Sequence, residues 1–246
     1  MRYLIVSDIH SNWQALEAVL SHAEGRWDRA LCCGDLVGYG ADPNPVTDWV
    51  RNHSTHTVRG NHDKISLGSE DLEWFNPVAR AAAEWTRGAL TPENAAFLAA
   101  LPRGPAIVED FAIAHGSPLD EDEYLVAASE AVDAFAYLEH RLTFFGHTHL
   151  QGGFVWNRAR VETIPSFIAF QNPAAMELDP ACAYLINPGS VGQPRDGDPR
   201  AAYVIYDSSR KLLTYLRAEY DIEAAQRRIV EAGLPPVLAD RLALGR

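Results

Sequence analysis

The stretch LTFFGHTHL, residues 142–150, changes from apolar to polar within one short segment. Its first four residues are typical of a buried strand, whereas His147 and His149 follow directly after Gly146. Two histidines one residue apart are unfavourable in a buried apolar strand, but they are common ligands in a metal site. Side chains at i and i+2 of an extended segment face one side, so both imidazoles are expected to reach one place. Gly146 lets the backbone bend toward that place with no side chain in the way.

The same change from apolar to polar recurs where four other apolar segments stop. The polar residues there are Asp8 and His10 in SDIH, Asp35 in GDLVG, Asn61 and His62 in GNHD, and His115 in IAHGS. In open α/β sheets, ligands bind at the edge where strands end. One divalent ion cannot use all these groups, whereas two ions about 3.5–4 Å apart can if a carboxylate bridges them. A single motif would be weak evidence, since a lone histidine is more often a core residue, so the prediction depends on all five.

Strands and helices alternate over the first 60 residues. The pattern predicts strands at 2–8, 29–35 and 55–60, with helices at 12–25 and 46–53 between them. This alternation favours parallel pairing in an α/β sheet. Residues 64–101 predict a helical insertion, and after residue 150 the chain is β-rich until two short helices end it. We expect one domain over residues 1–246, with two sheets.

Composition limits the class of partner. The 246 residues carry a net charge of −12, which disfavours long nucleic acid because such binding needs a basic surface. Small phosphorylated ligands remain compatible, since a bound metal reverses the local charge. No apolar run reaches the roughly 18 residues that span a bilayer, so no membrane association is expected. Three cysteines without framework spacing indicate a reducing compartment, and we expect a cytoplasmic protein. The oligomeric state stays open.

The motifs SDIH, GDLVG, GNHD, a later histidine and GHTH occur in an order that resembles the calcineurin-like metallophosphoesterase superfamily. They span residues 8–149, and the β-rich tail fits the second sheet of that family. The resemblance implies a four-layer α-β-β-α sandwich of two mixed sheets, with a dinuclear metal centre between the sheet ends.

The resemblance also assigns roles to single residues. One metal ion would be held by Asp8, His10, Asp35 and His149. The other would be held by Asp35, Asn61, His115 and His147, so that Asp35 bridges the two ions. A bridging hydroxide would attack phosphorus, and His62 would protonate the leaving oxygen as general acid. The cofactors would be two divalent ions among Mn, Fe, Zn, Co and Ni, all of which suit such ligands.

One departure from the family pattern bears on the substrate. Protein phosphatases of the superfamily carry GDYVDRG where this chain has GDLVGYG, so Gly38 replaces an aspartate and Tyr39 replaces a phosphate-binding arginine. This weakens the resemblance to protein phosphatases and to the bacterial symmetrical diadenosine tetraphosphate hydrolases. The segment GDLVGYGADPNP is more similar to a bacterial branch linked to phosphodiesters, nucleotides and dinucleoside polyphosphates.

Several residues have two interpretations that the sequence leaves open. The candidate substrate contacts are Asn12, Arg59, Arg195 and Tyr39. Asn12 could instead cap a helix, Arg59 could form a buried ion pair, and Arg195 could be a solvated loop residue near NPGS, 187–190. Asp63 could orient His62 or cap a helix. The helical insertion could stack a base through Trp74, or its residues Phe75 and Trp85 could simply pack the helices onto the core. The acidic segment DEDE, residues 120–123, is expected to be a solvated turn.

The function expected from these observations is a phosphoesterase for a small phosphorylated substrate, namely phosphodiesters, nucleotides or dinucleoside polyphosphates. A protein phosphatase or nuclease of the same superfamily is one alternative. A non-catalytic scaffold is another, because the retromer scaffold subunit keeps the fold but lacks catalytic histidines. The presence of His62 and all seven candidate ligands favours an enzyme here.

Overall fold

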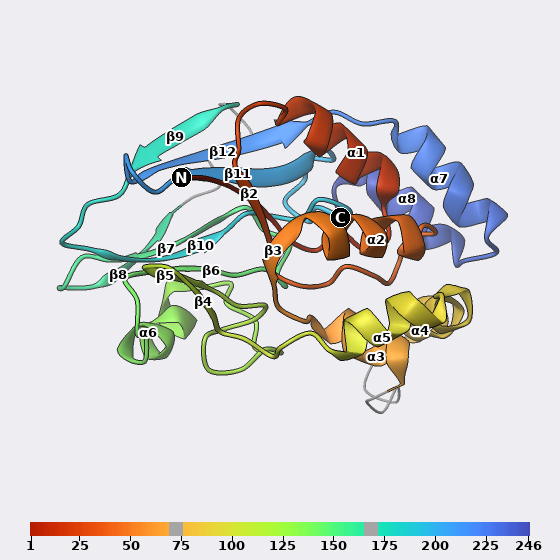
Figure 1. The fold of residues 1–246 in the computed structure, drawn as a ribbon, viewed down its shortest axis with the longest axis horizontal. Helices are drawn as coiled ribbons and strands as arrows, with labels where there is room; N and C mark the ends of the chain where they lie inside the picture. Colours follow the sequence, from red (N-terminus) through yellow and green to blue (C-terminus); the bar gives the residue numbers. More distant parts are fainter. Residues whose placement is uncertain (69–75, 165–171) are drawn as a thin grey trace.

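Two mixed six-stranded sheets form the centre of the computed structural model, which describes residues 1–68, 76–164 and 172–246 (Figure 1). The first sheet consists of β1 (Arg2–Val6), β2 (Arg29–Cys32), β3 (Ser54–Thr57), β9 (Ala174–Glu177), β11 (Ala201–Asp207) and β12 (Leu212–Ala218). The second consists of β4 (Ala106–Val108), β5 (Phe111–Ile113), β6 (Leu142–Phe144), β7 (Gly152–Trp156), β8 (Val161–Ile164) and β10 (Ala183–Asn187). Their orders are β3-β2-β1-β11-β12-β9 and β4-β5-β6-β10-β7-β8.

Helices cover the outer face of each sheet and one end of the molecule. The described helices are α1 (Trp13–His22), α2 (Pro43–His53), α3 (Asn61–Leu67), α4 (Pro77–Ala89), α5 (Pro92–Ala99), α6 (Ala128–Ala136), α7 (Ile222–Glu231) and α8 (Pro236–Leu244). Helices α1 and α2 lie against the first sheet, and α6 lies against β7 and β8 of the second. This α/β architecture of two mixed sheets between helices confirms the predicted fold class.

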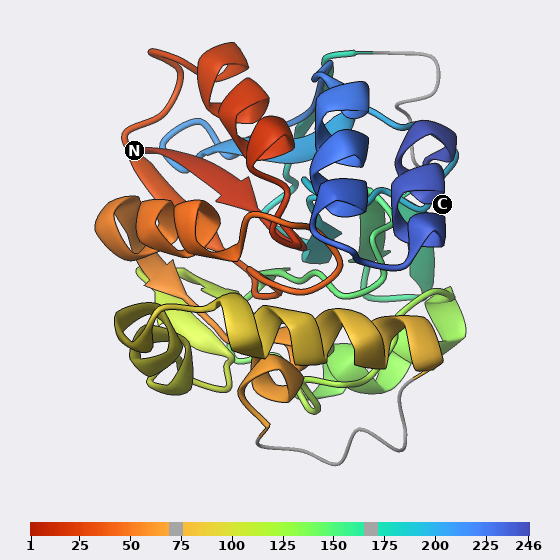
Figure 2. The ribbon, with the colours of Figure 1, turned by 90° about the vertical axis from the view of Figure 1, so that its right-hand side faces the viewer.

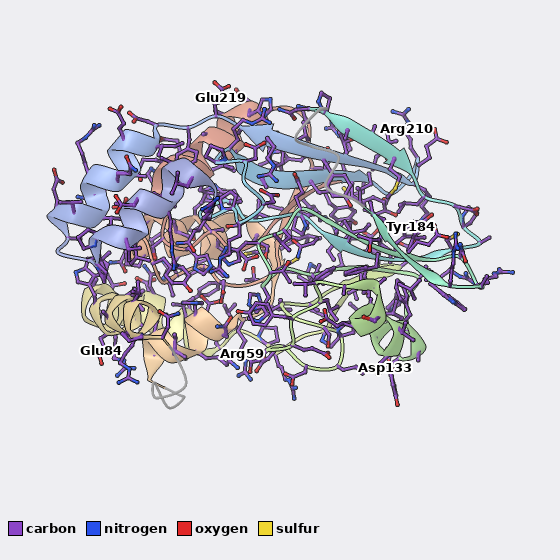
Figure 3. The ribbon with its side chains drawn as sticks, turned by 180° about the vertical axis from the view of Figure 1, so that it is seen from behind. Arg59, Glu84, Asp133, Tyr184, Arg210 and Glu219 are labelled. Atoms are coloured by element: carbon purple, nitrogen blue, oxygen red, sulfur yellow. The ribbon has the colours of Figure 1, made fainter. Side chains whose placement is uncertain are left out.

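Successive side chains of a strand point to opposite faces of its sheet, and this explains why sheets and helices pack in layers. In β1, Tyr3 and Ile5 face the second sheet, while Leu4 and Val6 join the apolar cluster that includes Leu16 of α1. In the second sheet, β10 divides its side chains in the same way between the interior and the cluster under α6. The space between the sheets is filled with side chains, as Figure 3 shows from behind. Each fully buried aliphatic side chain contributes about 1.5–3 kcal/mol.

Parallel pairing brings the ends of several strands to one edge. Strands β1, β2 and β3 pair in parallel, as do β5, β6 and β10. The loops that follow these strands therefore gather at one end of the molecule. Figure 2 looks onto this end, where α1, α2, α4 and α7 lie around the loops that follow β1 and β2.

Element boundaries differ from the predictions at the polar ends of strands. The strands predicted at 2–8 and 29–35 end at Val6 and Cys32, because the SD and GD dipeptides leave the sheet as turns. Strand β9 and helix α3 were not predicted. Helices α4 and α5 lie within the predicted insertion 64–101. Residues 165–171 of the region predicted to be β-rich lie outside the described residues. None of the described helices is both long and apolar enough to span a membrane.

Candidate metal centre

Seven polar side chains predicted from the motifs meet at the loop end of the two sheets. They are Asp8 and His10 after β1, Asp35 after β2, Asn61 at the start of α3, His115 after β5, and His147 and His149 after β6. Each is at most 7% exposed. Among the described residues, two groups could hold a metal ion, and they share Asp35; the groups are Asp8, His10, Asp35 and His149, and Asp35, His115 and His147. Within each group the ligand atoms lie within 4.8 Å of one another. The Oδ1 atom of Asn61 lies 3.1 Å from the Nε2 atom of His115.

The backbone brings these side chains together through left-handed turns. Asp8, His10, Asp35, His147 and His149 all have φ between 49° and 67°. The expectation that extended backbone aligns the side chains at i and i+2 is therefore wrong at both SDIH and GHTH. A non-glycine residue in this region costs on the order of 1–3 kcal/mol, and such residues cluster at functional sites. Strain at five residues of one cluster indicates that the cluster serves a function beyond folding.

Each of the four histidines is oriented by a backbone carbonyl. The ring contacts are His10 Nδ1 to Val37 O at 3.1 Å, His115 Nδ1 to Cys33 O at 2.8 Å, His149 Nδ1 to Gln193 O at 2.6 Å, and His147 Nε2 to Asp122 O at 3.2 Å. A carbonyl can only accept, so in each contact the ring nitrogen carries the proton. When the ring is neutral, its second nitrogen then has a lone pair directed into the cluster, which is the usual arrangement of histidines that bind metals.

The centre of the cluster has acceptors without donors. The Oδ2 atom of Asp35 is buried and accepts no hydrogen bond, and it lies 3.6 Å from His10 Nε2 and 3.4 Å from His115 Nε2. The Nε2 atoms of His10 and His149 are 3.0 Å apart. Two lone pairs at this distance repel unless a proton or a cation lies between them. Histidine and carboxylate donors in this arrangement fit divalent cations of borderline softness.

The pKa shifts of the buried carboxylates and histidines also indicate a cation site. Burial raises the pKa of Asp8 to about 7. Burial also raises the pKa of Asp35, but His115 and His62 outweigh this and hold it well below its usual value. Burial lowers the pKa of His115, yet the Asp35 and Asp8 carboxylates raise it to about 10. The cluster thus retains a proton on His115 to balance Asp35, a position that a cation can take over.

Gly146 has the role expected from the sequence. A Cβ atom at this position would overlap Ser7 Oγ and lie 2.7 Å from Asp8 Oδ2. The absence of a side chain lets the amide of His147 donate to the Asp8 carboxylate at 3.1 Å.

His62 lies beside the cluster in an aromatic environment. Its ring centroid is 4.3 Å from that of Tyr39 and 4.9 Å from that of His10. Gly38 has φ +88°, and a Cβ there would lie 2.7 Å from His62 Nδ1. Gly38 therefore makes room for His62 where the protein phosphatases carry an aspartate. Burial lowers the pKa of His62 to about 4, so the ring is neutral near pH 7.

Asp63 supports the backbone of the site rather than His62. Its carboxylate accepts hydrogen bonds from the amides of Gly60, Asp35, Leu36 and Val37. Of the two interpretations left open by the sequence, the structure therefore shows the helix cap, extended to the loop that carries Asp35.

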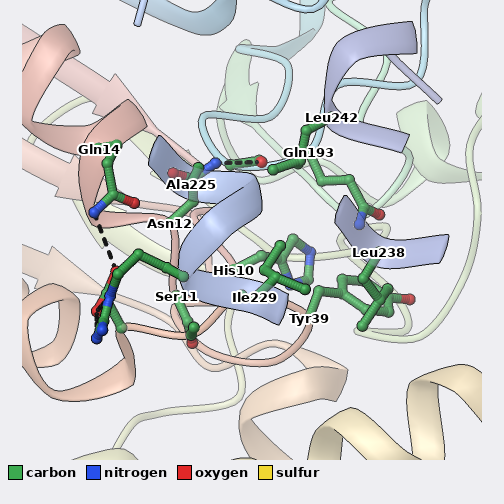
Figure 4. A pocket seen from close by; sticks show the side chains of 15 residues that line it. His10, Ser11, Asn12, Gln14, Tyr39, Gln193, Ala225, Ile229, Leu238 and Leu242 are labelled. Atoms are coloured by element: carbon green, nitrogen blue, oxygen red, sulfur yellow. Dashed lines mark hydrogen bonds and ion pairs between the residues drawn. The ribbon is translucent and has the colours of Figure 1, made fainter. Parts of the chain in front are cut away.

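The candidate substrate contacts divide into two pairs. Asn12 caps α1 by accepting from the amide of Ala15 at 3.1 Å, and it donates to the Gly192 carbonyl (Figure 4). Arg59, labelled in Figure 3, pairs with Glu121 at 2.8 Å. Asn12 therefore caps a helix, and Arg59 forms an ion pair, which were the alternative interpretations of these two side chains.

The other two candidates lie together at the site. Arg195 Nη2 is 3.4 Å from the Tyr39 hydroxyl and 3.2 Å from Gln193 Oε1, and the guanidinium carbon lies 5.9 Å from the centre of the Tyr39 ring. The amide of Arg195 donates to the carbonyl of His149. Tyr39 is 6% exposed and also lines a small pocket below α7 and α8 (Figure 4).

The helical insertion packs against the C-terminal helices. Ala79 and Ala82 of α4 share an apolar cluster with Tyr39 and Leu238, and Trp85 packs against this cluster. Trp85 therefore has the packing role. Trp74 and Phe75 lie outside the described residues.

Sequence reasoning missed two features of the site. The acidic segment 120–123 is not simply solvated, because Glu121 is 7% exposed and pairs with Arg59 and Lys64. One residue beyond this segment, the ring centroid of Tyr124 lies 3.8 Å from that of His147. No motif marks Tyr124; its only signal was an aromatic residue in the loop that follows His115.

Comparison with known proteins identifies the family of this chain. Residues 1–211 match the sequence pattern of the calcineurin-like phosphoesterase superfamily domain. The chain belongs to the calcineurin-like phosphoesterase superfamily. An uncharacterized protein of Methanocaldococcus jannaschii is 37% identical over 258 residues, which cover 98% of this chain and 97% of that protein.

Two solved structures share the fold over its full length. A metallophosphoesterase from Sphaerobacter thermophilus is 39% identical, with a TM-score of 0.87 and coverage of 100% of this chain and 99% of that one. A hypothetical protein from Pyrococcus horikoshii is 17% identical, with a TM-score of 0.80 and coverage of 100% and 98%. The second likeness shows the fold alone.

Proposed function

We propose that the protein is a phosphoesterase that uses two divalent metal ions to hydrolyse small phosphorylated substrates: phosphodiesters, nucleotides or dinucleoside polyphosphates. The observation that carries the proposal is the position of Asp35, which is shared by two groups of buried ligand atoms. Membership of a superfamily of phosphoesterases supports the hydrolytic class. Asn61 would complete the second group, since its Oδ1 atom is next to His115.

When bound, two close divalent cations would activate water and neutralise charge on the phosphoryl oxygens. His62 would supply the proton for the leaving oxygen. In the free protein its pKa of about 4 keeps it neutral, and the negative charge of a substrate phosphate beside it would raise this pKa. A bound substrate phosphate would thus oppose the effects of burial and of the two cations, both of which lower this pKa, and His62 must carry a proton to act as general acid.

Arg195 would bind a phosphoryl oxygen. Tyr39 stands where the protein phosphatases of the superfamily carry a phosphate-binding arginine, and the Arg195 guanidinium lies over its ring. A guanidinium from a different loop could therefore replace the missing one, with Tyr39 as its support. Arginine suits this role because its planar donors match two oxygens of one phosphate.

The proposal is tested by metal content and hydrolysis measured on the same samples. Protein stripped with a chelator and reloaded separately with Mn²⁺, Co²⁺, Ni²⁺, Zn²⁺ or Fe²⁺ should bind about two ions per chain. It should hydrolyse at least one ester in a panel of monoesters, diesters, cyclic nucleotides and dinucleoside polyphosphates. Asp35→Asn should lose both ions, whereas His149→Gln should lose one, because only Asp35 belongs to both groups.

Two results would contradict the proposal. Binding of at most one ion by the wild-type protein would exclude the two-metal centre. Two bound ions without turnover of any ester in the panel, under any of the five metals, would favour the non-catalytic scaffold.

A further inference from the structure

Tyr124 places an exposed ring beside the candidate metal centre. Its centroid is 3.8 Å from that of His147, with an angle of 35° between the two ring planes. His147 is 4% exposed, whereas Tyr124 is 51% exposed. One face of the phenol thus rests on a candidate metal ligand, and much of the rest of the ring faces solvent.

The turn before Tyr124 is held in place by buried charges. Lys64, itself 6% exposed, contacts Glu121 at 3.1 Å and Asp122 at 2.8 Å. The carbonyl of Asp122 accepts from the ring of His147, and Leu125 is buried in the cluster under α6. Tyr124 therefore lies between Asp122 and Leu125, both of which are held in place. This lowers the conformational entropy that the Tyr124 side chain loses when its ring orders against a ligand.

The charge of Arg195 acts on both Tyr39 and Tyr124. Burial raises the pKa of both phenols, and the Arg195 guanidinium opposes this in each. Its Nη2 atom lies 3.4 Å from the Tyr39 hydroxyl oxygen. The three residues come from the loops after β2, β5 and β10.

We propose that Tyr124 is a specificity residue that stacks on a planar ring in the organic part of the substrate while Arg195 binds the phosphate. This inference rests on the proposed phosphoesterase function and narrows its substrates to phosphate esters that carry a nucleobase. The arrangement fits such a ligand, because the Tyr124 ring lies on the candidate ligand His147 and the amide of Arg195 donates to the carbonyl of the candidate ligand His149. Stacking on an aromatic side chain tolerates any base, so the geometry selects a nucleotide rather than a particular one.

The experiment compares two ligands that differ only in the ring. Calorimetry on the Mn²⁺-loaded protein measures Kd for the phosphonate analogues of adenosine 5′-monophosphate and ribose 5-phosphate, in which a methylene group prevents hydrolysis. The wild-type protein should bind the adenosine compound more tightly. Tyr124→Leu should weaken binding of that compound by about 5- to 150-fold, the range expected for one stacked base, and leave the ribose compound unchanged. Tyr124→Phe should keep the preference. Tyr137→Leu, which removes an exposed tyrosine at the end of α6, is the matched control.

Three results would overturn the inference. The wild-type protein could bind both analogues equally, Tyr124→Leu could retain the preference, or Tyr124→Leu could weaken both analogues alike. The last result would mean that Tyr124 only supports His147. Metal-dependent hydrolysis on the same samples reports separately on the proposed function, which fails if the wild-type protein hydrolyses no ester, whatever the two analogues show.

Discussion

At the scale of single residues, His62 differs from the other buried histidines of the site. The four candidate ligands direct a nitrogen into the cluster, whereas His62 lies against the rings of Tyr39 and His10 at its rim. It belongs to neither of the two groups that could hold a metal ion. This position agrees with the proposed role of His62 as the acid that protonates the leaving oxygen.

His62→Gln should lower kcat by about 10²- to 10⁴-fold, the usual contribution of a positioned acid, and leave the metal content unchanged. Kinetics on the best ester of the panel and elemental analysis check the two parts. His53→Gln, an exposed histidine at the end of α2, should change neither. An unchanged kcat in His62→Gln would remove the general acid from the mechanism, and loss of metal would make His62 a ligand.

At the scale of secondary-structure elements, Asp63 joins the start of α3 to the loop after β2. Four backbone amides donate to its two carboxylate oxygens, and one of them belongs to Asp35. Asp63→Asn replaces one acceptor oxygen by an NH₂ group that faces buried donors. We expect a loss of about 1–3 kcal/mol in the free energy of unfolding, with weaker metal binding because Asp35 shifts.

Denaturant unfolding and metal titration measure the two effects of Asp63→Asn. Asp48→Asn on α2 is the matched control, since Asp48 is half exposed and, within the described part of the chain, pairs only with Arg51 in the same helix. Its unfolding free energy should change by less than about 0.5 kcal/mol. Equal changes in the two variants would show that the four amides of the loop are held by other contacts.

Elements also show how far the sequence predicts this protein. The motifs that follow strands predicted which seven side chains meet, because parallel strands within each sheet end at the same edge, and these edges of the two sheets meet at the site. They did not predict the left-handed turns, because positive φ is uncommon for every residue with a side chain, even for aspartate and histidine, in which it is enriched. Arg59 and Tyr124 depend on which loop lies next to them across the two sheets, and no local pattern contains that information.

At the scale of the whole molecule, the two sheets are tied together behind the site by Arg217. This side chain is fully buried, although it lies in β12 of the first sheet. It donates to Gln151, which directly precedes β7 of the second sheet, at 2.8 Å, and it pairs with Asp196. Asp196 follows Arg195 directly, so one buried guanidinium fixes both the sheet contact and the loop that carries the proposed phosphate contact.

Arg217→Met keeps much of the side-chain volume but leaves the Asp196 carboxylate, 8% exposed, without its cationic partner. Removing one partner of a buried ion pair costs about 3–5 kcal/mol, so the free energy of unfolding should fall by that amount. KM should rise because the loop that carries Arg195 loosens, and metal binding should weaken in the group that contains His149, because the Gln193 carbonyl of the same loop orients this ring. The double variant Arg217→Met/Asp196→Asn should recover part of the stability, since no charge is then left buried. Arg160→Met, which breaks an exposed pair with Glu162, should cost less than about 1 kcal/mol. If Arg217→Met cost no more than Arg160→Met, the buried pair would not be what holds the two sheets and the 190–200 loop together.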